Sequence, residues 1–294
     1  MDLKTALLDW ATKASVENPP TERDRPLRRP EEIDKKWFDA IFGEKSEVEC
    51  MREQLDVLRT PSDDRETRLK ALEQLEFLCE LTHNANDLTK LGGLDVVFDH
   101  AERADEDIQV MSLGILGICM PNNPVFCDAV MADPSRLERL VELLAQRDSM
   151  AVRAKALWAL SSLVRNSRPA LEAFVTKHDG VQRLRNALTE TENMTMVRRA
   201  ISLLGFLESE NMVDAEFQRL LGSELVRLDD LECSELIVNI LRDMHDRNAR
   251  LDSSVIRPAL LAVREREQQG VLRDAERDPT VLGAVDHLLD ALPQ

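Results

Sequence analysis

The chain has 294 residues, is 43% hydrophobic and carries a formal net charge of −17 at pH 7. This acidic balance argues against binding to nucleic acid or to anionic membrane surfaces, because both would repel the chain. Only 4% of the residues are aromatic and Tyr is absent, while Leu, Ala, Glu and Arg are abundant. The composition therefore favours an all-helical fold over one with strands.

The first residues differ in composition from the rest of the chain. Residues 1–14 have the apolar spacing of a short helix, and the stretch "SVENPPTERDRPLRRPEE" after them is charged and Pro-rich. We expect this stretch to be disordered, because it has too little apolar surface to offset the entropy of ordering it. "IDKKWFDAIFG" then places Trp37 and Phe38 at helical spacing, either as a capping helix or as an exposed binding motif. We predict a flexible arm over residues 1–47 and a folded domain over residues 48–294.

Beyond the arm, a set of apolar residues at helical spacing recurs. The first members of four sets, Leu72, Leu113, Leu157 and Ile201, are 41, 44 and 44 residues apart (113−72, 157−113, 201−157). A weaker copy follows at Val238. A period of about 40–47 residues is typical of armadillo and HEAT repeats.

Each copy also contains a second helical segment, such as "SRLERLVELLA", and in places a short helix such as "PALEAFVTK". Glycines at 92–93, 180 and 222 stand before or at the start of the second segments, where we expect a sharp change of chain direction. Two long helices and a short one per copy indicate armadillo repeats. We predict an all-α armadillo-repeat solenoid of about four repeats over roughly residues 64–232, flanked by capping helices.

Residue patterns typical of chemistry are missing from the sequence. It has no phosphate-binding glycine loop, no H-E-x-x-H and no zinc-like Cys–His spacing. The five Cys are scattered, and we expect buried free thiols. The N-terminus does not resemble a secretory signal, and no apolar run approaches the roughly 20 residues that span a bilayer. We therefore expect a cytoplasmic protein that is not an enzyme and uses no cofactor or metal.

The basic residues are informative because acidic residues outnumber them. Arg153 and Arg199 stand near the starts of successive long helices and suggest a short basic ladder, although solvation or pairing with the acids of "LTETEN" is an alternative. The Trp-x-x-x-Asn ladder of nuclear-import adaptors is not repeated here, since Trp158 is followed four residues later by Ser162. A groove for basic peptides is therefore not predicted.

Several segments, taken in order, resemble one family. "LLDWATKAS", "WFDAIFG", "RLKALEQLEFLCELTHNANDLTKLGGLDVV", "VRAKALWALSSLVRN" and "VRRAISLL" are similar to segments of the armadillo-type nucleotide exchange factors of heat-shock protein 70, the Hsp70-binding-protein family. The resemblance covers nearly the whole chain, although His83 stands where the family often has Asp before N-A-N.

This resemblance implies a co-chaperone without catalytic activity. Its concave face would bind the ATPase domain of a heat-shock protein 70 and displace one lobe, so that ADP leaves and the client is released. We expect a monomer of the cytosolic branch. A generic armadillo scaffold for another partner remains the alternative.

The resemblance also assigns candidate residues. The chaperone-facing candidates are Asn84, Ala85, Asn86, Arg153, Arg165, Asn166 and Arg199. Ala85 would permit close approach because it is small. The candidates for a client-release role in the arm are Leu7, Leu8, Trp10, Trp37 and Phe38.

Overall fold

A computed structural model describes residues 45–61, 64–191, 193–214, 216–268 and 280–293. Over these residues every regular element is an α-helix, which confirms the predicted all-α class. The chain divides into two compact units, Met1–Cys50 and Met51–Gln294. Helix α3 (Glu47–Arg59) crosses this boundary, and the description that follows concerns the second unit.

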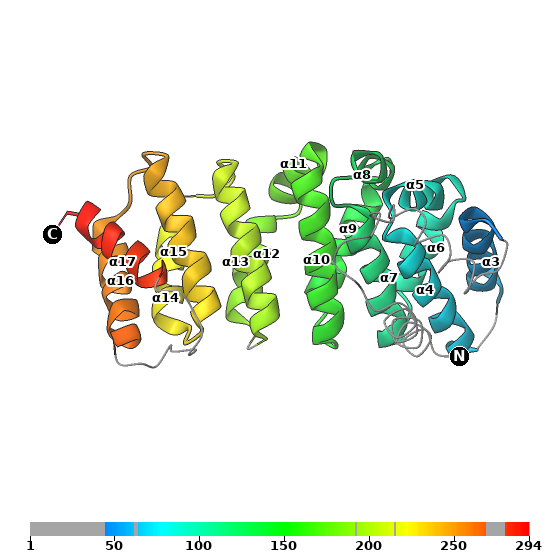
Figure 1. The fold of residues 1–294 in the computed structure, drawn as a ribbon, viewed down its shortest axis with the longest axis horizontal. Helices are drawn as coiled ribbons and strands as arrows, with labels where there is room; N and C mark the ends of the chain where they lie inside the picture. Colours follow the sequence, from blue (N-terminus) through cyan, green and yellow to red (C-terminus); the bar gives the residue numbers. More distant parts are fainter. Residues whose placement is uncertain (1–44, 62–63, 192, 215, 269–279, 294) are drawn as a thin grey trace, which may run out of the picture. The chain divides into compact units, whose positions relative to one another are not determined.

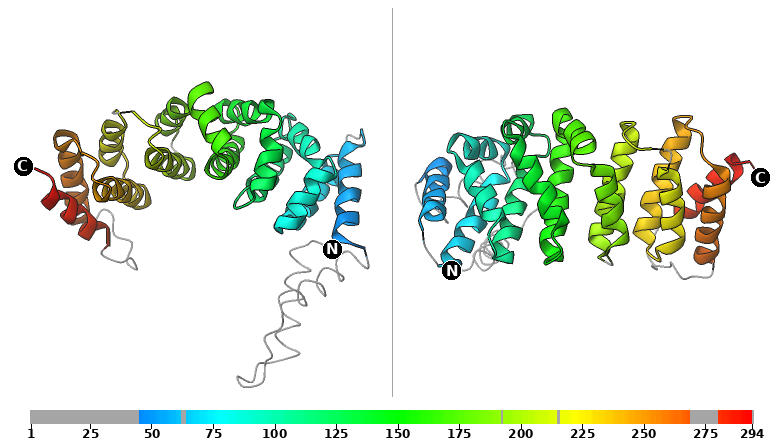
Figure 2. Two further views of the ribbon diagram at one scale, coloured as in Figure 1. Left: turned by 90° about the horizontal axis from the view of Figure 1, so that it is seen from above. Right: turned by 180° about the vertical axis from the view of Figure 1, so that it is seen from behind.

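The second unit consists of two rows of helices (Figure 1). Consecutive members of the first row pack side by side. This row contains α4 (Arg65–Cys79), α7 (Glu106–Cys119), α10 (Met150–Asn166), α13 (Met194–Ser209), α15 (Leu231–Asp246) and α17 (Thr280–Ala291). The second row contains α6 (Gly93–Ala101), α9 (Pro134–Ala145), α12 (Gly180–Thr189), α14 (Phe217–Arg227) and α16 (Ser253–Gln268). Seen from above, the rows curve, and the first row lies on the concave side (Figure 2).

Short helices connect three of the repeats. They are α5 (Thr82–Lys90), α8 (Pro124–Met131) and α11 (Arg168–Lys177), and each follows a helix of the first row. Between α13 and α14 the described residues contain no such helix. Each repeat thus pairs a helix of the first row with one of the second, and the stacking of these pairs confirms the predicted solenoid. The predicted second long helix is wrong in two repeats, because α6 and α12 are no longer than the connecting helices α5 and α11.

The recurring apolar sets form the core between neighbouring repeats. Leu72, Leu113, Leu157 and Ile201 are fully buried, and so is Leu160. All five Cys are buried and free, as predicted. Burial of one side chain of this kind stabilises the fold by about 1.5–3 kcal/mol, so the repeats are held together mainly by these layers.

Every helix of the first row from α4 to α15 begins with a side-chain cap. The residue before the helix accepts a hydrogen bond from the backbone N–H three residues later, which satisfies one of the four unpaired donors at the helix start. These capping residues are Asp64, Asp105, Ser149, Asn193 and Asp230.

The glycines do not all serve the predicted turns. Gly92 does adopt the left-handed conformation before α6, with φ 68°. At the corresponding break before α12, however, the left-handed residue is Asp179, with φ 53°, and Gly180 is helical. Gly222 lies inside α14, so the prediction that it marks a helix start is wrong. A Cβ at Gly222 would lie 2.9 Å from Val255, so close packing on α16 accounts for this glycine.

Candidate partner-binding surface

The described residues hold no group of three or more His, Cys, Asp or Glu that could bind a metal ion. In the same part of the chain, no helix combines the length and hydrophobicity that crossing a membrane requires. Burial raises the pKa of the Cys233 thiol to about 12 and that of Cys127 to about 11, so neither is a thiolate nucleophile at neutral pH.

Three cations and two aromatic rings lie together on α10 and α13, and we call them the central strip. Its residues are Lys155, Trp158 and Arg165 of α10, and Arg199 and Phe206 of α13. The Nζ atom of Lys155 lies 4.9 Å from the centre of the Trp158 ring, and the Cζ atom of Arg199 lies 5.9 Å from it. The Cζ atom of Arg165 lies 4.9 Å from the centre of the Phe206 ring. These distances are typical of cation–π contacts.

The neighbouring helix α7 makes room for the Trp158 ring. A Cβ atom at Gly117 would lie only 2.6 Å from the indole, so Gly leaves the space that the ring occupies beside α7. A Cβ atom at Gly114 would meet the Glu76 carboxylate at 2.7 Å and Nζ of Lys155 at 3.6 Å. The two glycines of "LGILG" thus position the α10 side of the strip.

Backbone hydrogen bonds hold the two arginines. Nη1 of Arg199 donates to the carbonyl of Ala154 at 2.8 Å, and Nη2 of Arg165 donates to the carbonyl and hydroxyl of Ser202 at 2.7 and 3.0 Å. Partial burial lowers the pKa of both guanidinium groups, which stay protonated because an arginine in water has a pKa above 12. Since carbonyl acceptors are neutral, the positive charges remain.

The strip stands out because, in the part of the chain that the structure describes, its cations form no ion pair, although Glu76 lies near enough to Lys155 to interact with its charge. Among the described residues, Lys155, Arg165 and Arg199 form no ion pair with a carboxylate, whereas the adjacent Arg198 pairs with Asp230 at 2.6 Å and with Glu232 at 2.5 Å. In a chain of net charge −17, three cations without an ion pair in the described structure make this surface a candidate site.

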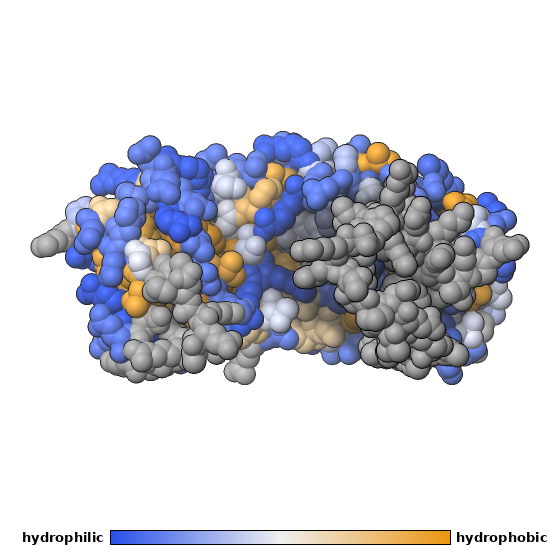
Figure 3. Space-filling model, in the orientation of Figure 1, coloured by the Kyte–Doolittle hydropathy of each residue, from blue (hydrophilic) through white to orange (hydrophobic). Residues whose placement is uncertain are grey.

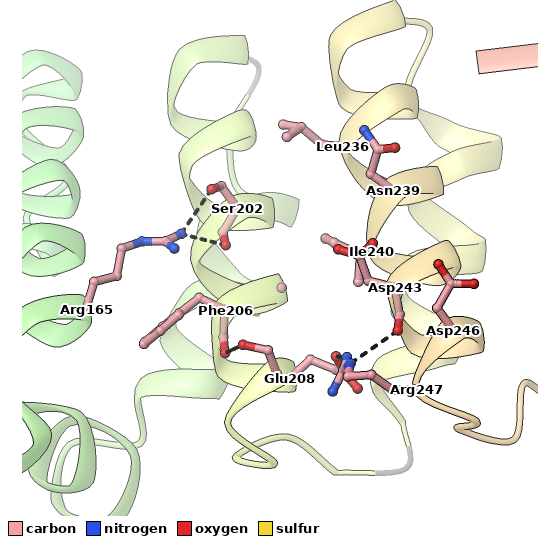
Figure 4. Close-up of a pocket in the computed structure, with 12 residues that line it drawn as sticks. Arg165, Ser202, Phe206, Glu208, Leu236, Asn239, Ile240, Asp243, Asp246 and Arg247 are labelled. Atoms are coloured by element: carbon pink, nitrogen blue, oxygen red, sulfur yellow. Dashed lines mark hydrogen bonds and ion pairs between the residues drawn. The ribbon is translucent and has the colours of Figure 1, made fainter. Parts of the chain in front are cut away.

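A groove of about 570 Å³ continues from the strip between α13 and α15 (Figure 4). Arg165 reaches toward Ser202 at one side, and Phe206, Leu236 and Ile240 supply apolar walls. Figure 3 shows hydrophobic residues exposed among hydrophilic ones over these two helices. Away from Arg165 the lining contains Asp243 and Asp246 together with Arg247, which pairs with Glu208.

The predicted basic ladder has the wrong members. Arg153 is buried, donates from Nε to the carbonyl of Leu144 at 3.1 Å and lies 3.7 Å from Glu190. The alternative, pairing with the acids of "LTETEN", is thus correct for Arg153. Lys155 holds the position that corresponds to Arg199, because each is the sixth residue of its helix.

The three candidates of the first repeat lie outside the central strip. Asn84 and Ala85 are only 1% exposed, and Nδ2 of Asn84 donates to the carbonyl of Leu78 at 2.9 Å. Asn86 is half-buried on the same helix, α5. Because Ala85 is enclosed, it offers no surface for close approach, and the expectation that a partner would contact its side chain does not fit this structure.

Asn166 is at the end of α10 and has a structural role there. Its Nδ2 donates to the carbonyl of Ser162 at 2.8 Å, and its Oδ1 accepts from the backbone N–H of Asn122 at 3.0 Å. This bond ties the end of α10 to the turn after α7, where Asn122 has φ 53°. The arm candidates lie outside the described residues. They are Leu7, Leu8, Trp10, Trp37 and Phe38.

Comparison with known protein families shows to which family the chain belongs. Residues 84–230, half of its length, match the profile described as the SIL1/FES1/HPBP1 C-terminal domain. The chain belongs to the SIL1/FES1/HPBP1 family. A second profile, described as nucleotide exchange factor Fes1, matches residues 5–88. The central strip lies within the SIL1/FES1/HPBP1 domain.

Individual members of the SIL1/FES1/HPBP1 family agree with this placement. The "Hsp70 nucleotide exchange factor FES1" of Saccharomyces cerevisiae is 28% identical over 232 residues, which is 77% of this chain and 78% of that protein. The "Nucleotide exchange factor SIL1" of Rattus norvegicus is 29% identical over 222 residues, and the match covers 73% of this chain. It covers 47% of the rat protein, so the chain spans about half of that relative's length.

Solved structures confirm the fold of this family member. A computationally designed armadillo repeat protein for modular peptide recognition superposes with a TM-score of 0.63 over 83% of this chain and 100% of the designed chain, at 14% identity. Another designed armadillo repeat protein gives a TM-score of 0.59 over 83% of this chain and 100% of that chain, also at 14% identity. At such low identity the likeness shows the architecture alone.

Proposed function

We propose that this chain is a co-chaperone that promotes nucleotide exchange on a heat-shock protein 70. Membership of the SIL1/FES1/HPBP1 family carries the proposal, since the matched relatives bear the name nucleotide exchange factor. The chain acts by binding and catalyses no reaction of its own. Its partner is the ATPase domain of the chaperone.

The central strip is the contact that we assign to the ATPase domain. Lys155, Arg165 and Arg199 present positive charge, and an arginine can bond a carboxylate through two nitrogens at once. Binding must favour the form of the ATPase domain whose lobes are apart, because a ligand shifts an equilibrium only through its differential affinity for the two states. ADP then leaves, ATP rebinds and the client is released.

The remaining parts of the proposal concern the arm and the setting. We assign residues 1–47 to a client-release arm and residues 48–294 to the repeat domain. The Fes1 profile, which covers residues 5–88, supports a function for the arm. The free thiols fit a reducing compartment, which supports a cytoplasmic location, and we propose a monomer.

The test is the release rate of fluorescent ADP from a heat-shock protein 70 with and without the chain. We expect acceleration by the wild type and its loss in Arg199→Ala. Arg219→Ala, on α14 of the second row, is the control and should keep full activity, since Arg219 is exposed and its ion pair in the described structure is local, with Glu216. No acceleration by the wild type would refute the proposal.

Reciprocal coupling separates exchange from simple binding. If the chain weakens ADP binding about 100-fold, the coupling free energy is about 2.7 kcal/mol, and ADP must weaken binding of the chain by the same factor. Titration of the pair with and without ADP measures this factor. Equal affinities in both conditions would identify a scaffold that binds the chaperone without exchanging its nucleotide.

A further inference from the structure

Trp158 has two features that an ordinary core residue would lack. Its ring is half-buried, and it lies against Gly117 of α7, where a Cβ atom would come within 2.6 Å. Two cations from two different repeats approach the same ring, Lys155 at 4.9 Å and Arg199 at 5.9 Å. The ring therefore connects charges that the chain supplies 44 residues apart (199−155).

The surroundings leave this pair of cations available. Arg199 is held by a carbonyl and Lys155 by no described hydrogen bond or ion pair. Glu76 is the acid that approaches Lys155 across Gly114, but the two form no ion pair in the described structure, and burial raises the pKa of the Glu76 carboxyl. Two like charges near one ring repel each other, so an anion placed between them would be bound more tightly than by either alone.

We propose that Trp158 is the positioning residue of a two-cation clamp, formed by Lys155 and Arg199, that takes a carboxylate-bearing segment of the partner. The clamp rests on the proposed function, since its partner is the ATPase domain of the chaperone. The indole fixes the directions of the two cations before binding, which reduces the entropy lost when the contact forms. Trp158 does not itself need to touch the partner.

The chain offers matched variants for a test. Trp158→Leu removes the aromatic face but keeps an apolar side chain over Gly117, and Trp158→Phe restores a smaller ring. Arg199→Gln removes one cation of the clamp. Arg198→Gln makes the same change of net charge at the adjacent residue, whose charge is already paired with Asp230.

The measurement is the affinity of the full chain for a heat-shock protein 70 at low and physiological salt. We expect Trp158→Leu to weaken binding about tenfold, or about 1.4 kcal/mol, at low salt, and clearly less at about 0.15 M salt, where charges are screened beyond about 8 Å. Trp158→Phe should bind within about threefold of wild type. Trp158→Leu should add little to Arg199→Gln, because both act on the same contact, whereas its effect should add fully to that of Arg198→Gln.

Two results would overturn the clamp. If Trp158→Leu loses the same affinity at both salt concentrations, the ring acts through direct apolar contact or through packing. Full additivity with Arg199→Gln would show that Trp158 does not act through that cation.

A second experiment separates failure of the clamp from failure of the proposed function. If the wild type does not bind the chaperone, the proposed function fails, and an oligo-glutamate peptide then tests the clamp alone. With Trp10 and Trp37 replaced by Phe, the fluorescence of Trp158 should change saturably with this peptide and not with oligo-lysine. The response should be lost in Arg199→Gln and kept in Arg198→Gln. No response to oligo-glutamate would overturn the clamp.

Discussion

Two Gly→Ala substitutions, one at Gly117 and one at Gly283, test whether the Trp158 ring is fixed against α7. Both glycines lie inside helices, α7 and α17, so Ala should gain up to about 1 kcal/mol of helix propensity at either position. At Gly283 nothing lies within 4 Å of the added Cβ atom, so no steric clash offsets the gain in helix propensity. We expect Gly283→Ala to stabilise the protein by about 0.5–1 kcal/mol.

At Gly117 the same methyl group meets the indole. The Cβ atom would lie 2.6 Å from Cε3 and 2.7 Å from Cζ3 of Trp158, far inside the optimum of about 3.5–4.0 Å between carbon atoms. Overpacking of this kind costs about 1–3 kcal/mol. After the propensity gain, we expect Gly117→Ala to destabilise the protein by up to about 2 kcal/mol, so the two variants should differ by about 1–3 kcal/mol.

Urea unfolding followed by far-UV circular dichroism measures both free energies, and an unchanged slope with urea assigns the change to stability. Gly117→Ala should also weaken chaperone binding, because the displaced ring no longer holds Lys155 and Arg199. If Gly117→Ala is as stable as Gly283→Ala, the ring moves aside without cost. The argument that α7 fixes Trp158 would then be wrong.

Three further predictions follow from burial and charge. Leu160 is fully buried between repeats, so Leu160→Ala should lower the free energy of unfolding by about 2–5 kcal/mol in urea titration. The hydrogen bond from Arg198 lowers the pKa of the Asp230 carboxyl to about 2, so its contribution to stability is present above about pH 4 and is lost as the pH falls toward 2. In Arg198→Gln the free energy of unfolding should depend less on pH in this range. The same pH dependence as in the wild type would contradict the assignment. Because burial raises the pKa of Cys233 to about 12, its alkylation by iodoacetamide at pH 8, followed by mass spectrometry, should be slow until the chain is unfolded in urea.

The helical period and the repeat length determined the fold in advance. Leucines such as Leu113 and Leu157 recur at helical spacing within a copy and about 44 residues apart between copies. This arrangement has one simple solution, in which each copy covers the apolar face of the next. The burial of Leu160 confirms that solution.

To predict which way an individual side chain points, one must know the residue at which its helix starts. Apolar spacing alone does not give that residue. Aligning Arg153 with Arg199 is wrong by two positions, and two positions turn a side chain by about 200° around a helix axis. The caps supply the missing signal, since Ser149 and Asn193 are 44 residues apart and align Lys155 with Arg199. Asn84 and Ala85 show a second limit, because a family pattern gives position along the chain but not exposure.

The same caps also differ in charge, which affects the cations near them. Two of the aspartate caps also pair with an arginine of the preceding helix of the first row. Asp105 pairs with Arg65 at 2.6 Å, and Asp230 pairs with Arg198 at the same distance. The two helices that carry the strip, α10 and α13, begin instead with the neutral caps Ser149 and Asn193, which satisfy the backbone donors equally well without bringing a carboxylate. Stability of the helix starts and availability of the cations are therefore compatible. The neutral cap Asn193 brings no carboxylate to Lys155 on the preceding helix α10, whereas the charged cap Asp230 pairs with Arg198 of α13 and leaves Arg199 without an ion pair in the described structure.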